Sequence, residues 1–378
     1  MPRGLRGLAS APDYAAMNHQ AELFNLSLEN LCRHQQQPFF VLAAGNDKPN
    51  RVMRNLHQLV PVAFRSSAMF CGRLKDVVVF GRSYVTDAPG QAVFRGQSAA
   101  NYDSDEWRRY YENEVRQEPG AWPRIQEECC YIGGSMAEVA NFGHFVFEYL
   151  SRLVAFDMVG ALRCPVVVHD SIPLPWLSFI ELYGVKRIIR VPRLPASRYD
   201  SVWVAACPHY NDGAGKGYAL WDDGVLAMHH VLRQNAVVGT DGPKRIFMGR
   251  GRAAHRRLLN EDEVWRDLES AGFVYPDFTG LSAAEQVRLV GSAEIIVTVG
   301  GAGSVITQWA PKNCIIIEIL QKRFAGVFGS RGFAVVLGQS FCRVPAADVG
   351  EVGMNTDMLV DVEAVKSVVG VALQLSAQ

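Results

Sequence analysis

Three polar residues with helical spacing interrupt an apolar stretch in the first half of the chain. In NFGHFVFEYLSRL, His144, Glu148 and Arg152 are each four residues apart, so they would share one face of a helix that begins at Asn141. The helix N-terminus disfavours a cationic His144, whereas the carboxylate of Glu148 favours it and can orient the ring. A neutral imidazole held by a carboxylate can act as a general base toward a hydroxyl group. The alternative is an ordinary His–Glu pair on a solvated helix face.

The second candidate is the glycine-rich stretch TVGGAGSVITQW, which directly follows the apolar run IIV. A glycine turn between a strand and a helix lets backbone N–H groups bind a phosphate, and the helix dipole adds positive potential. The dinucleotide fingerprint would need glycine at Ile306, and the Gly215–Lys216 pair is followed by Gly217 rather than Ser or Thr. Hydride transfer and hydrolysis of nucleoside triphosphates are therefore disfavoured. A tight turn without a ligand is the alternative.

Arginines and one carboxylate extend the phosphate hypothesis. The segment KRIFMGRGRAAHRR places Arg250, Arg256 and Arg257 just after an apolar strand pattern, where guanidinium groups could bind phosphate oxygens in a bidentate manner. A solvated basic loop is the alternative. Glu318 interrupts the apolar run IIIEI, and burial of an unpaired carboxylate is costly, so it lies either at an exposed strand end or against ribose hydroxyls. Diphosphate and ribose together describe a nucleotide sugar as well as any other nucleotide.

Several other enzyme classes lack their signature residues here. The chain has no G-x-S-x-G nucleophile elbow and no H-E-x-x-H motif, and its remaining His and Cys residues lack the spacing of a metal site. We therefore predict no metal and no cofactor. The eight cysteines include no C-x-x-C pair, which favours reduced thiols and a cytoplasmic protein over a disulfide framework.

Composition narrows the classes of partner. The chain has 378 residues, with 38 Lys and Arg against 38 Asp and Glu, so its net charge gives no reason to expect nucleic acid or an acidic membrane surface. No run approaches the ~20 apolar residues of a membrane-spanning helix, and the first residues lack the apolar core of a secretion signal. Peripheral contact with a membrane or an assembly complex stays open.

Alternating strands and helices are expected to position these residues. Residues 76–97 are expected to be β-rich and residues 104–118 to form a charged helix. Further strands are expected at 129–134, 165–170, 187–191, 202–207, 245–250, 295–299 and 315–319, and helices at 141–160, 176–184, 222–235, 260–271, 282–293, 304–310 and 361–374. Two capping boxes are expected, Asn260 with Glu263 and Ser282 with Glu285.

This alternation predicts the fold class. Strands that are apolar on both faces and separated by helices indicate parallel sheets covered on both sides. A linker-like segment at 235–244 divides the pattern into two sets. We therefore predict an α/β fold with two doubly wound, Rossmann-like domains that face a cleft, in which ligands bind at the carboxyl ends of the strands.

Taken in order, these segments resemble glycosyltransferase family 61, whose bacterial members occur with capsular and other surface polysaccharide genes. The resemblance rests on N-F-G-H-F-x-x-E-x-L-x-R-L at 141–153, G-R-x5-R-R-x-x-N-E-x-E at 249–263, G-F at 272–273, E-Q at 285–286, G-A-G at 301–303 and I-E-I at 317–319. It covers roughly residues 125–325 and is strongest over 245–319.

The resemblance implies a GT-B-like architecture and an inverting transfer without metal, with His144 and Glu148 as catalytic residues. The donor-binding residues that it implies are Arg250, Arg256, Arg257, Asn260, Glu261, Gly300, Gly301, Ala302, Gly303, Ser304 and Glu318. The expected domains are 1–240, on the acceptor side and Rossmann-like from about 125, then 241–355, which binds the nucleotide sugar, and 356–378, a C-terminal helix that packs back on the first domain.

The function expected from the resemblance is hexosyl or pentosyl transfer from a nucleotide-sugar donor, preferentially a UDP-sugar, to a glycan acceptor. One position departs from the family pattern, because Gly300 stands where a His usually precedes G-A-G. This departure motivates a second hypothesis, a non-catalytic nucleotide-sugar- or glycan-binding member of a polysaccharide assembly complex. A sugar-nucleotide isomerase of the same two-domain shape is a third.

Overall fold

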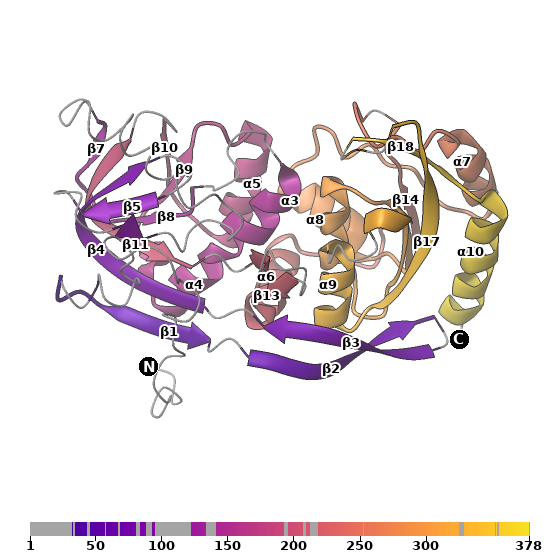
Figure 1. Ribbon diagram of the computed structural model, residues 1–378, viewed down its shortest axis with the longest axis horizontal. Helices are drawn as coiled ribbons and strands as arrows, with labels where there is room; N and C mark the ends of the chain where they lie inside the picture. The colour runs from indigo at the N-terminus through magenta and orange to yellow at the C-terminus, as the bar shows by residue number, and fades with distance from the viewer. Residues whose placement is uncertain are drawn as a thin grey trace.

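Two β-sheets with a layer of helices between them form the core of the molecule (Figure 1). The computed structural model describes residues 32, 35–43, 46–56, 58–66, 69–80, 84–87, 93–94, 122–133, 141–192, 196–206, 209–211, 218–251, 253–324, 329–351, 353 and 355–377. The expected helix at 104–118 lies outside the described residues. The mixed α/β class predicted from the sequence is confirmed.

The first sheet has the strand order β10-β9-β8-β11-β4-β5-β6. Outside this order, β1 pairs with β4 and β7 pairs with β11. Its strands are β1 (Phe39–Ala43), β4 (Met69–Phe80), β5 (Tyr84–Asp87), β6 (Val93–Phe94), β7 (Arg124–Ile125), β8 (Cys129–Tyr131), β9 (Val166–His169), β10 (Ile188–Val191) and β11 (Ser197–Ala205). Strands β8 to β11 run parallel, whereas β4 is antiparallel to β11. In β9, Val166 and Val168 enter one core and Val167 another, as a strand covered on both faces requires.

The second sheet has the order β12-β13-β3-β2-β17-β16-β15-β14, with β18 beside β17. Its strands are β2 (Asn46–Asn55), β3 (Gln58–Ser66), β12 (His209–Asn211), β13 (Tyr218–Leu220), β14 (Arg245–Met248), β15 (Ile295–Val299), β16 (Ile315–Gln321), β17 (Ser340–Val349) and β18 (Asp357–Val360). Strands β14 to β17 are parallel neighbours, so their carboxyl ends meet at one edge.

Helices fill the space between the sheets and cover the far face of the second sheet. They are α3 (Phe142–His144), the π-helical turn η3 (Phe145–Leu150), α4 (Arg152–Met158), η4 (Ala161–Arg163), α5 (Leu174–Tyr183), α6 (Asp222–Asn235), α7 (Glu261–Ser270), α8 (Ala283–Gly291), the 3₁₀ helix η5 (Ala302–Trp309), η6 (Lys322–Phe324), α9 (Gly329–Leu337) and α10 (Val362–Ser376). None of the helices described is both long and apolar enough to cross a bilayer.

The helix layer joins the two halves into one core. Helices α4, α5, α6, α8 and α9 lie between the sheets, whereas α7 and α10 lie beyond the second sheet (Figure 1). Phe179 of α5 stacks on Trp309 of η5 with ring centroids 5.0 Å apart, and Phe147 stacks on Phe333 of α9 at 4.7 Å. Burial of such aromatic rings is worth several kcal/mol, so these contacts bind the halves firmly.

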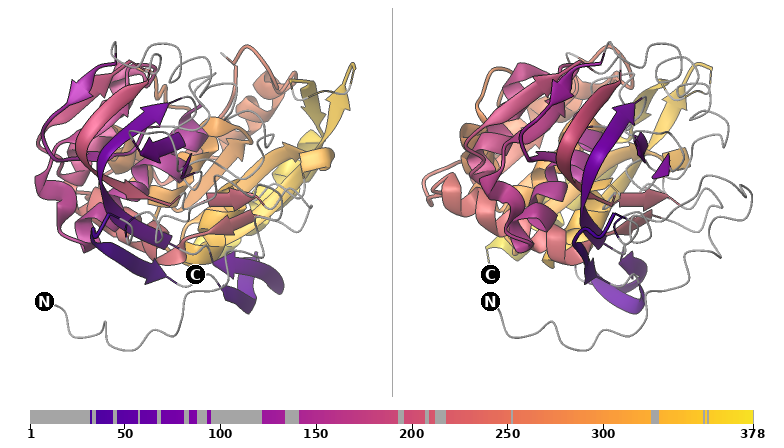
Figure 2. Two further views of the ribbon diagram at one scale, coloured as in Figure 1. Left: turned by 60° about the vertical axis from the view of Figure 1, so that its left-hand side comes forward. Right: turned by 90° about the vertical axis from the view of Figure 1, so that its left-hand side faces the viewer.

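The hairpin of β2 and β3 crosses the predicted domain boundary. It comes from the first part of the chain, yet Arg54 of β2 pairs with Ser340 of β17 in the second sheet. The hairpin lies along one edge of the molecule (Figures 1 and 2). The boundaries at 240 and 355 stay predictions, but sheet pairing does not follow them.

Local sequence signals explain most helix ends, with one correction. Ser282 and Glu285 form the expected capping box of α8, and Gly184 ends α5 with φ 113°. The expected capping box at Asn260 is wrong, because the Asn260 side chain does not cap α7. Its amide instead donates to the carbonyl of Val360 at 2.8 Å, which ties the start of α7 to β18.

The C-terminal helix α10 was expected to return to the first domain. Its contacts are with α7 and with β15, β16 and β17, so it covers the outer face of the second sheet. Val365, Val369 and Ala372 are buried there in one core with Ile295 and Ile317. The amphipathic pattern of residues 361–374 predicted the helix but carried no information about which sheet it covers.

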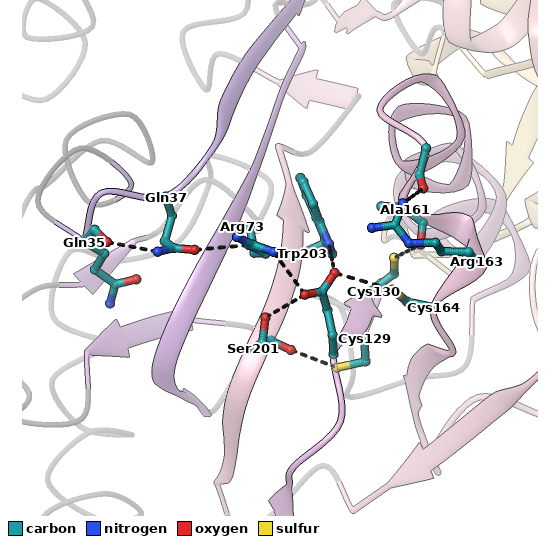
Figure 3. A network of polar contacts seen from close by, with 12 residues as sticks. Gln35, Gln37, Arg73, Cys129, Cys130, Ala161, Arg163, Cys164, Ser201 and Trp203 are labelled. Carbon is teal, nitrogen blue, oxygen red and sulfur yellow. Dashed lines mark hydrogen bonds and ion pairs between the residues drawn. The ribbon is translucent and has the colours of Figure 1, made fainter.

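A carboxylate ties three elements of the first sheet together (Figure 3). Glu128 accepts hydrogen bonds from Trp203 at 2.9 Å, from Arg73 and Ser201 at 3.2 Å each, and from the thiol of Cys164 at 3.6 Å. Burial alone would raise the pKa of Glu128, but the Trp203 bond and the Arg73 charge outweigh it and lower that pKa. The seven described cysteines are all free thiols, and Cys207 lies outside the described residues.

Candidate active site

The helix that carries His144 begins as the sequence predicts and then widens. The Asn141 side-chain oxygen accepts a hydrogen bond from the His144 N–H at 3.3 Å, which confirms Asn141 as the N-cap. The helix continues through the π-helical turn η3 into α4. Such turns insert an extra residue into a helix and occur frequently at functional sites.

His144 and Glu148 form the predicted pair. The Nδ1 atom of His144 lies 2.6 Å from Oε1 of Glu148, and because a carboxylate only accepts, Nδ1 carries the proton. The Glu148 side chain is fully buried, whereas 29% of the His144 side chain is exposed. A buried anchor therefore fixes a partly exposed imidazole, and Nε2 is the ring nitrogen that remains for a substrate.

Arg152, the third polar residue of the stripe, serves another purpose. It is fully buried, and its Nη1 donates to the carbonyl of Gly133 at 3.0 Å, just after β8. This bond fastens the helix to the first sheet. Only His144 of the three reaches the surface.

The second half of the site lies at the carboxyl ends of β14, β15 and β16. The glycine turn follows β15, and the N–H of Gly300 donates to the carbonyl of Ile319 on β16 at 2.8 Å. Arg250 follows β14, and its guanidinium lies directly over Gly301, where a Cβ would collide with it. The structure thus brings the arginine segment and the glycine turn together, which sequence spacing alone could only propose.

Glu261 holds this arginine in place through the backbone. Its carboxylate accepts from the N–H of Arg250 at 2.6 Å, from the N–H of Gly251 at 2.8 Å and from the hydroxyl of Tyr275 at 2.5 Å. Only 7% of Glu261 is exposed. Its carboxylate therefore shapes the loop after β14 rather than facing a ligand.

Arg250 and Arg256 are partly buried cations with few anions near them. Burial lowers the pKa of Arg250, and the charge of Arg256 lowers it further against an opposing effect of Glu261. Burial and the charge of Arg323 likewise lower the pKa of Arg256. Both guanidinium groups stay charged, because their pKa values lie far above neutrality. The lowered pKa values show that the surroundings disfavour these positive charges, so an anion would be stabilised there.

Three predicted donor-binding residues are engaged with partners inside the chain. Arg257 donates to Asp357 through Nε at 3.1 Å and Nη2 at 2.6 Å. Asn260 binds the backbone of β18, as described above. Glu318 is 3% exposed, and Arg343 donates to its Oε2 from Nε at 2.9 Å and from Nη2 at 2.5 Å. The ribose role of Glu318 stays a prediction.

The turn itself is built by Ser304 and by tight packing. The Ser304 hydroxyl donates to the carbonyl of Gly301 at 2.7 Å and accepts from Ser330 at 2.8 Å, so this hydroxyl closes the turn. At Gly300, a Cβ would collide with the side chain of Leu320. Leu320 therefore occupies the space that a side chain at position 300 would enter.

The two halves of the site are in direct contact. A Cβ at Gly143 would lie 3.6 Å from the Cα of Ala302, so the first turn of the His144 helix abuts the glycine turn. A Cβ at this distance would be in ordinary van der Waals contact with Ala302. His144 directly follows Gly143, so the helix that carries the imidazole lies against the glycine turn.

Residues that the sequence analysis missed come from elements with weak patterns. Arg323 and Phe324 of η6 follow β16, and Asp357 and Arg343 lie on β18 and β17. The available signal was the cationic KRF directly after an apolar strand pattern. Among the described residues, no group of three or more His, Cys, Asp or Glu is arranged to hold a metal ion.

The candidate active site thus combines an α/β fold, a base candidate and a basic glycine turn. Residues 142–317 match the sequence model of the family described as Glycosyltransferase 61. This match spans slightly less than half of the chain and supports its identification as a glycosyltransferase of this family. The match begins at α3 and ends within β16, so it contains both halves of the site. No curated protein matches the chain.

Proposed function

We propose that the protein is an inverting, metal-independent glycosyltransferase of GT-B-like architecture that acts in surface polysaccharide synthesis. In this proposal it moves a sugar from a nucleotide-sugar donor, preferentially a UDP-sugar, to a hydroxyl of a glycan. The observation that carries the proposal is the packing of α3 against the glycine turn, because the base candidate His144 then belongs to the helix next to the turn that we expect to bind phosphate. Residues 1–240 would supply the acceptor side and residues 241–355 the donor side.

The proposed reaction is a single displacement at the anomeric carbon of the donor. The acceptor oxygen forms a bond to that carbon while the bond to the donor phosphate breaks, and configuration inverts because attack and departure occur on opposite faces. Nε2 of His144 takes the proton of the acceptor hydroxyl, and Glu148 keeps the ring oriented through Nδ1. The leaving diphosphate takes the electron pair of the broken bond.

Charge on the leaving diphosphate would be balanced by the second half of the site. Arg250 and Arg256 supply positive charge, and the amides of residues 301–303 supply hydrogen-bond donors. The amides of Gly300 and Ser304 are already bound to the carbonyls of Ile319 and Gly301. Fixed cations of this kind can take the place that a divalent metal has in other transferases. Each of these donors should matter for the rate, because loss of one such donor typically slows a reaction by about 10²–10³-fold.

A second candidate function is a non-catalytic subunit that binds the nucleotide sugar or a glycan. The observation in its favour is the Leu320 side chain, which fills the space at Gly300. Binding of a donor without any transfer, across all donors and acceptors tried, would support this candidate.

The deciding experiment is a panel of UDP-, GDP- and CMP-sugars with a glycan acceptor, followed by substitution of His144. We expect one donor to be used, His144→Ala to lower kcat by about 10²-fold or more, and donor affinity to stay unchanged. Glu148→Gln should lower kcat in the same way. His230→Ala, at an exposed His on α6, is the matched control. Full turnover by His144→Ala would disprove the base assignment.

A further inference from the structure

We infer that Arg323, which lies beyond the end of the family match, is a further phosphate-binding residue, and that it acts with Arg250 and Arg256 on a donor that carries two phosphates. The inference rests on the proposed function, because it concerns the same donor site. It adds Arg323 to the proposed donor site, and it predicts that the site prefers nucleoside-diphosphate donors to nucleoside-monophosphate donors.

The topology brings Arg323 to the same edge as the glycine turn. Strands β14, β15 and β16 are parallel neighbours in the second sheet. Arg250 follows the first of them, the glycine turn follows the second, and Arg323 follows the third. Ligands of parallel sheets bind at this edge, so all three segments face the expected position of a donor.

One aromatic ring links Arg323 to Arg256. The guanidinium carbon of Arg323 lies 4.7 Å from the ring centroid of Phe324, and that of Arg256 lies 5.9 Å from the same centroid. Two cations therefore share one ring, which attracts each of them but does not neutralise either. Arg256 also adopts φ 55°, an uncommon conformation for a residue with a side chain, as is frequent at functional sites.

The hydrogen-bonding capacity of these guanidinium groups is not used up by the described residues. Nη2 of Arg323 and Nε of Arg250 are buried without a hydrogen-bond acceptor. The Nε of Arg323 lies 3.2 Å from Oδ1 of Asp348, but this ion pair lacks hydrogen-bond geometry. A buried donor without an acceptor is destabilising, and a phosphate oxygen at this position would accept its hydrogen bond.

The balance of charge favours two phosphates over one. Asp348 compensates part of the charge of Arg323, and Glu261 compensates part of the charge of Arg250. The three guanidinium groups still exceed these two carboxylates. A nucleoside-diphosphate sugar carries about two negative charges on its phosphates and a nucleoside-monophosphate sugar about one, so the former interacts more strongly with three cations. The lowered pKa values of Arg250 and Arg256 agree with this surplus.

The test is calorimetric titration of the full chain with inorganic diphosphate, inorganic phosphate, UDP and UMP, with GDP and GMP added if the donor panel identifies guanosine. We expect Arg323→Gln to weaken the binding of diphosphate and UDP at least tenfold, and the binding of phosphate and UMP about threefold or less. Arg250→Gln is the reference variant for the donor site. Arg266→Gln, at an exposed arginine on α7, is the control and should bind as the unmodified chain does.

The outcomes separate this inference from the proposed function. If Arg250→Gln weakens UDP and Arg323→Gln does not, the inference is wrong and the proposed function stands. If neither variant changes the binding of any nucleotide, the proposed donor site is wrong. If Arg323→Gln weakens the binding of diphosphates and monophosphates equally and also lowers Tm, the role of Arg323 is structural only. Partial recovery in Arg323→Lys, which keeps the charge but not the planar fork, is expected.

Discussion

At the scale of single residues, the histidines of this chain differ most in their surroundings. His144 is partly exposed and held by a carboxylate, whereas His229 of α6 is buried between the two halves. Nδ1 of His229 lies 2.6 Å from the carbonyl of Gln308 and donates to it. Burial lowers the pKa of His229 to about 4, against the effect of that bond and with help from the charge of Arg233.

His229 should therefore make stability depend on pH in a defined range. In the unfolded chain His229 takes up a proton as the pH falls through 6.5, but in the folded protein only near pH 4. Between these values the unfolded state binds more protons, so the free energy of unfolding falls as the pH falls, by up to about 3 kcal/mol. Above pH 6.5 this residue adds no pH dependence.

Urea unfolding at pH 7.5 and pH 5 measures this dependence. We expect His229→Gln, which keeps an N–H donor for Gln308, to lose less stability between the two pH values than the unmodified protein. His230→Gln, at the next and exposed position, should lose as much as the unmodified protein. If all three proteins lose the same stability between the two pH values, His229 is not the cause of the pH dependence.

The local parts of the site could be predicted at this scale. His144 with Glu148 and the Asn141 cap depend on residues within a few positions of one another, where helix geometry fixes the neighbours. The partners of Arg257 and Glu318 could not be predicted. Asp357 and Arg343 reach them from β18 and β17, and their distance along the chain leaves no periodic signal.

At the scale of secondary-structure elements, two helical glycines should respond in opposite ways to the same change. Gly370 lies within α10, and a Cβ there would meet no atom within 4 Å. Gly370→Ala should raise the free energy of unfolding by about 0.5–1 kcal/mol, because alanine loses less conformational freedom in a helix.

Gly224 in α6 is the matched comparison. A Cβ there would collide with the buried ring of Trp221, so Gly224→Ala should lower stability despite the same gain in helix propensity. Thermal unfolding of both variants tests the pair. A rise in Tm for Gly224→Ala, or a fall for Gly370→Ala, would show that packing around these helices is misjudged.

The elements with strong patterns could be predicted, and those with mixed patterns could not. The apolar strands β9, β14, β15 and β16 were expected near their observed positions, as were α6 and α8. Helix α9 and strands β17 and β18 were not predicted from the sequence. In β17, buried and exposed residues are interleaved with Arg343 and Pro345, which obscures the alternation of a strand. A helix was expected at 304–310, and the structure has the tighter 3₁₀ type at Ala302–Trp309.

At the scale of the whole molecule, the shared helix layer should make the two halves unfold together. Phe179 and Trp309 are fully buried in that layer, on elements from opposite sides of the linker. We expect Phe179→Ala to cost about 3–5 kcal/mol and to destabilise both sheets equally. Hydrogen exchange of amides in β9 and β15 measures each sheet separately.

The control for this experiment lies on the same helix. Leu174 of α5 is 64% exposed, so Leu174→Ala should change stability by less than about 0.5 kcal/mol. Exchange that becomes faster in β9 but not in β15 would mean that the halves are energetically independent. The α/β class was predictable from alternating strands and helices, but this coupling was not, because it arises from side chains that meet only after the sheets have formed.

The β2–β3 hairpin has a consequence for the synthesis of the chain. Its residues 46–66 leave the ribosome early, but β2 joins the second sheet by pairing at Arg54 with Ser340 of β17. Most of the polypeptide must be translated before this pairing can form. Until then the nascent chain presents an uncovered strand, which is a site for wrong pairing with other chains. Such a long-range closing step should make folding slow and dependent on chaperones during translation.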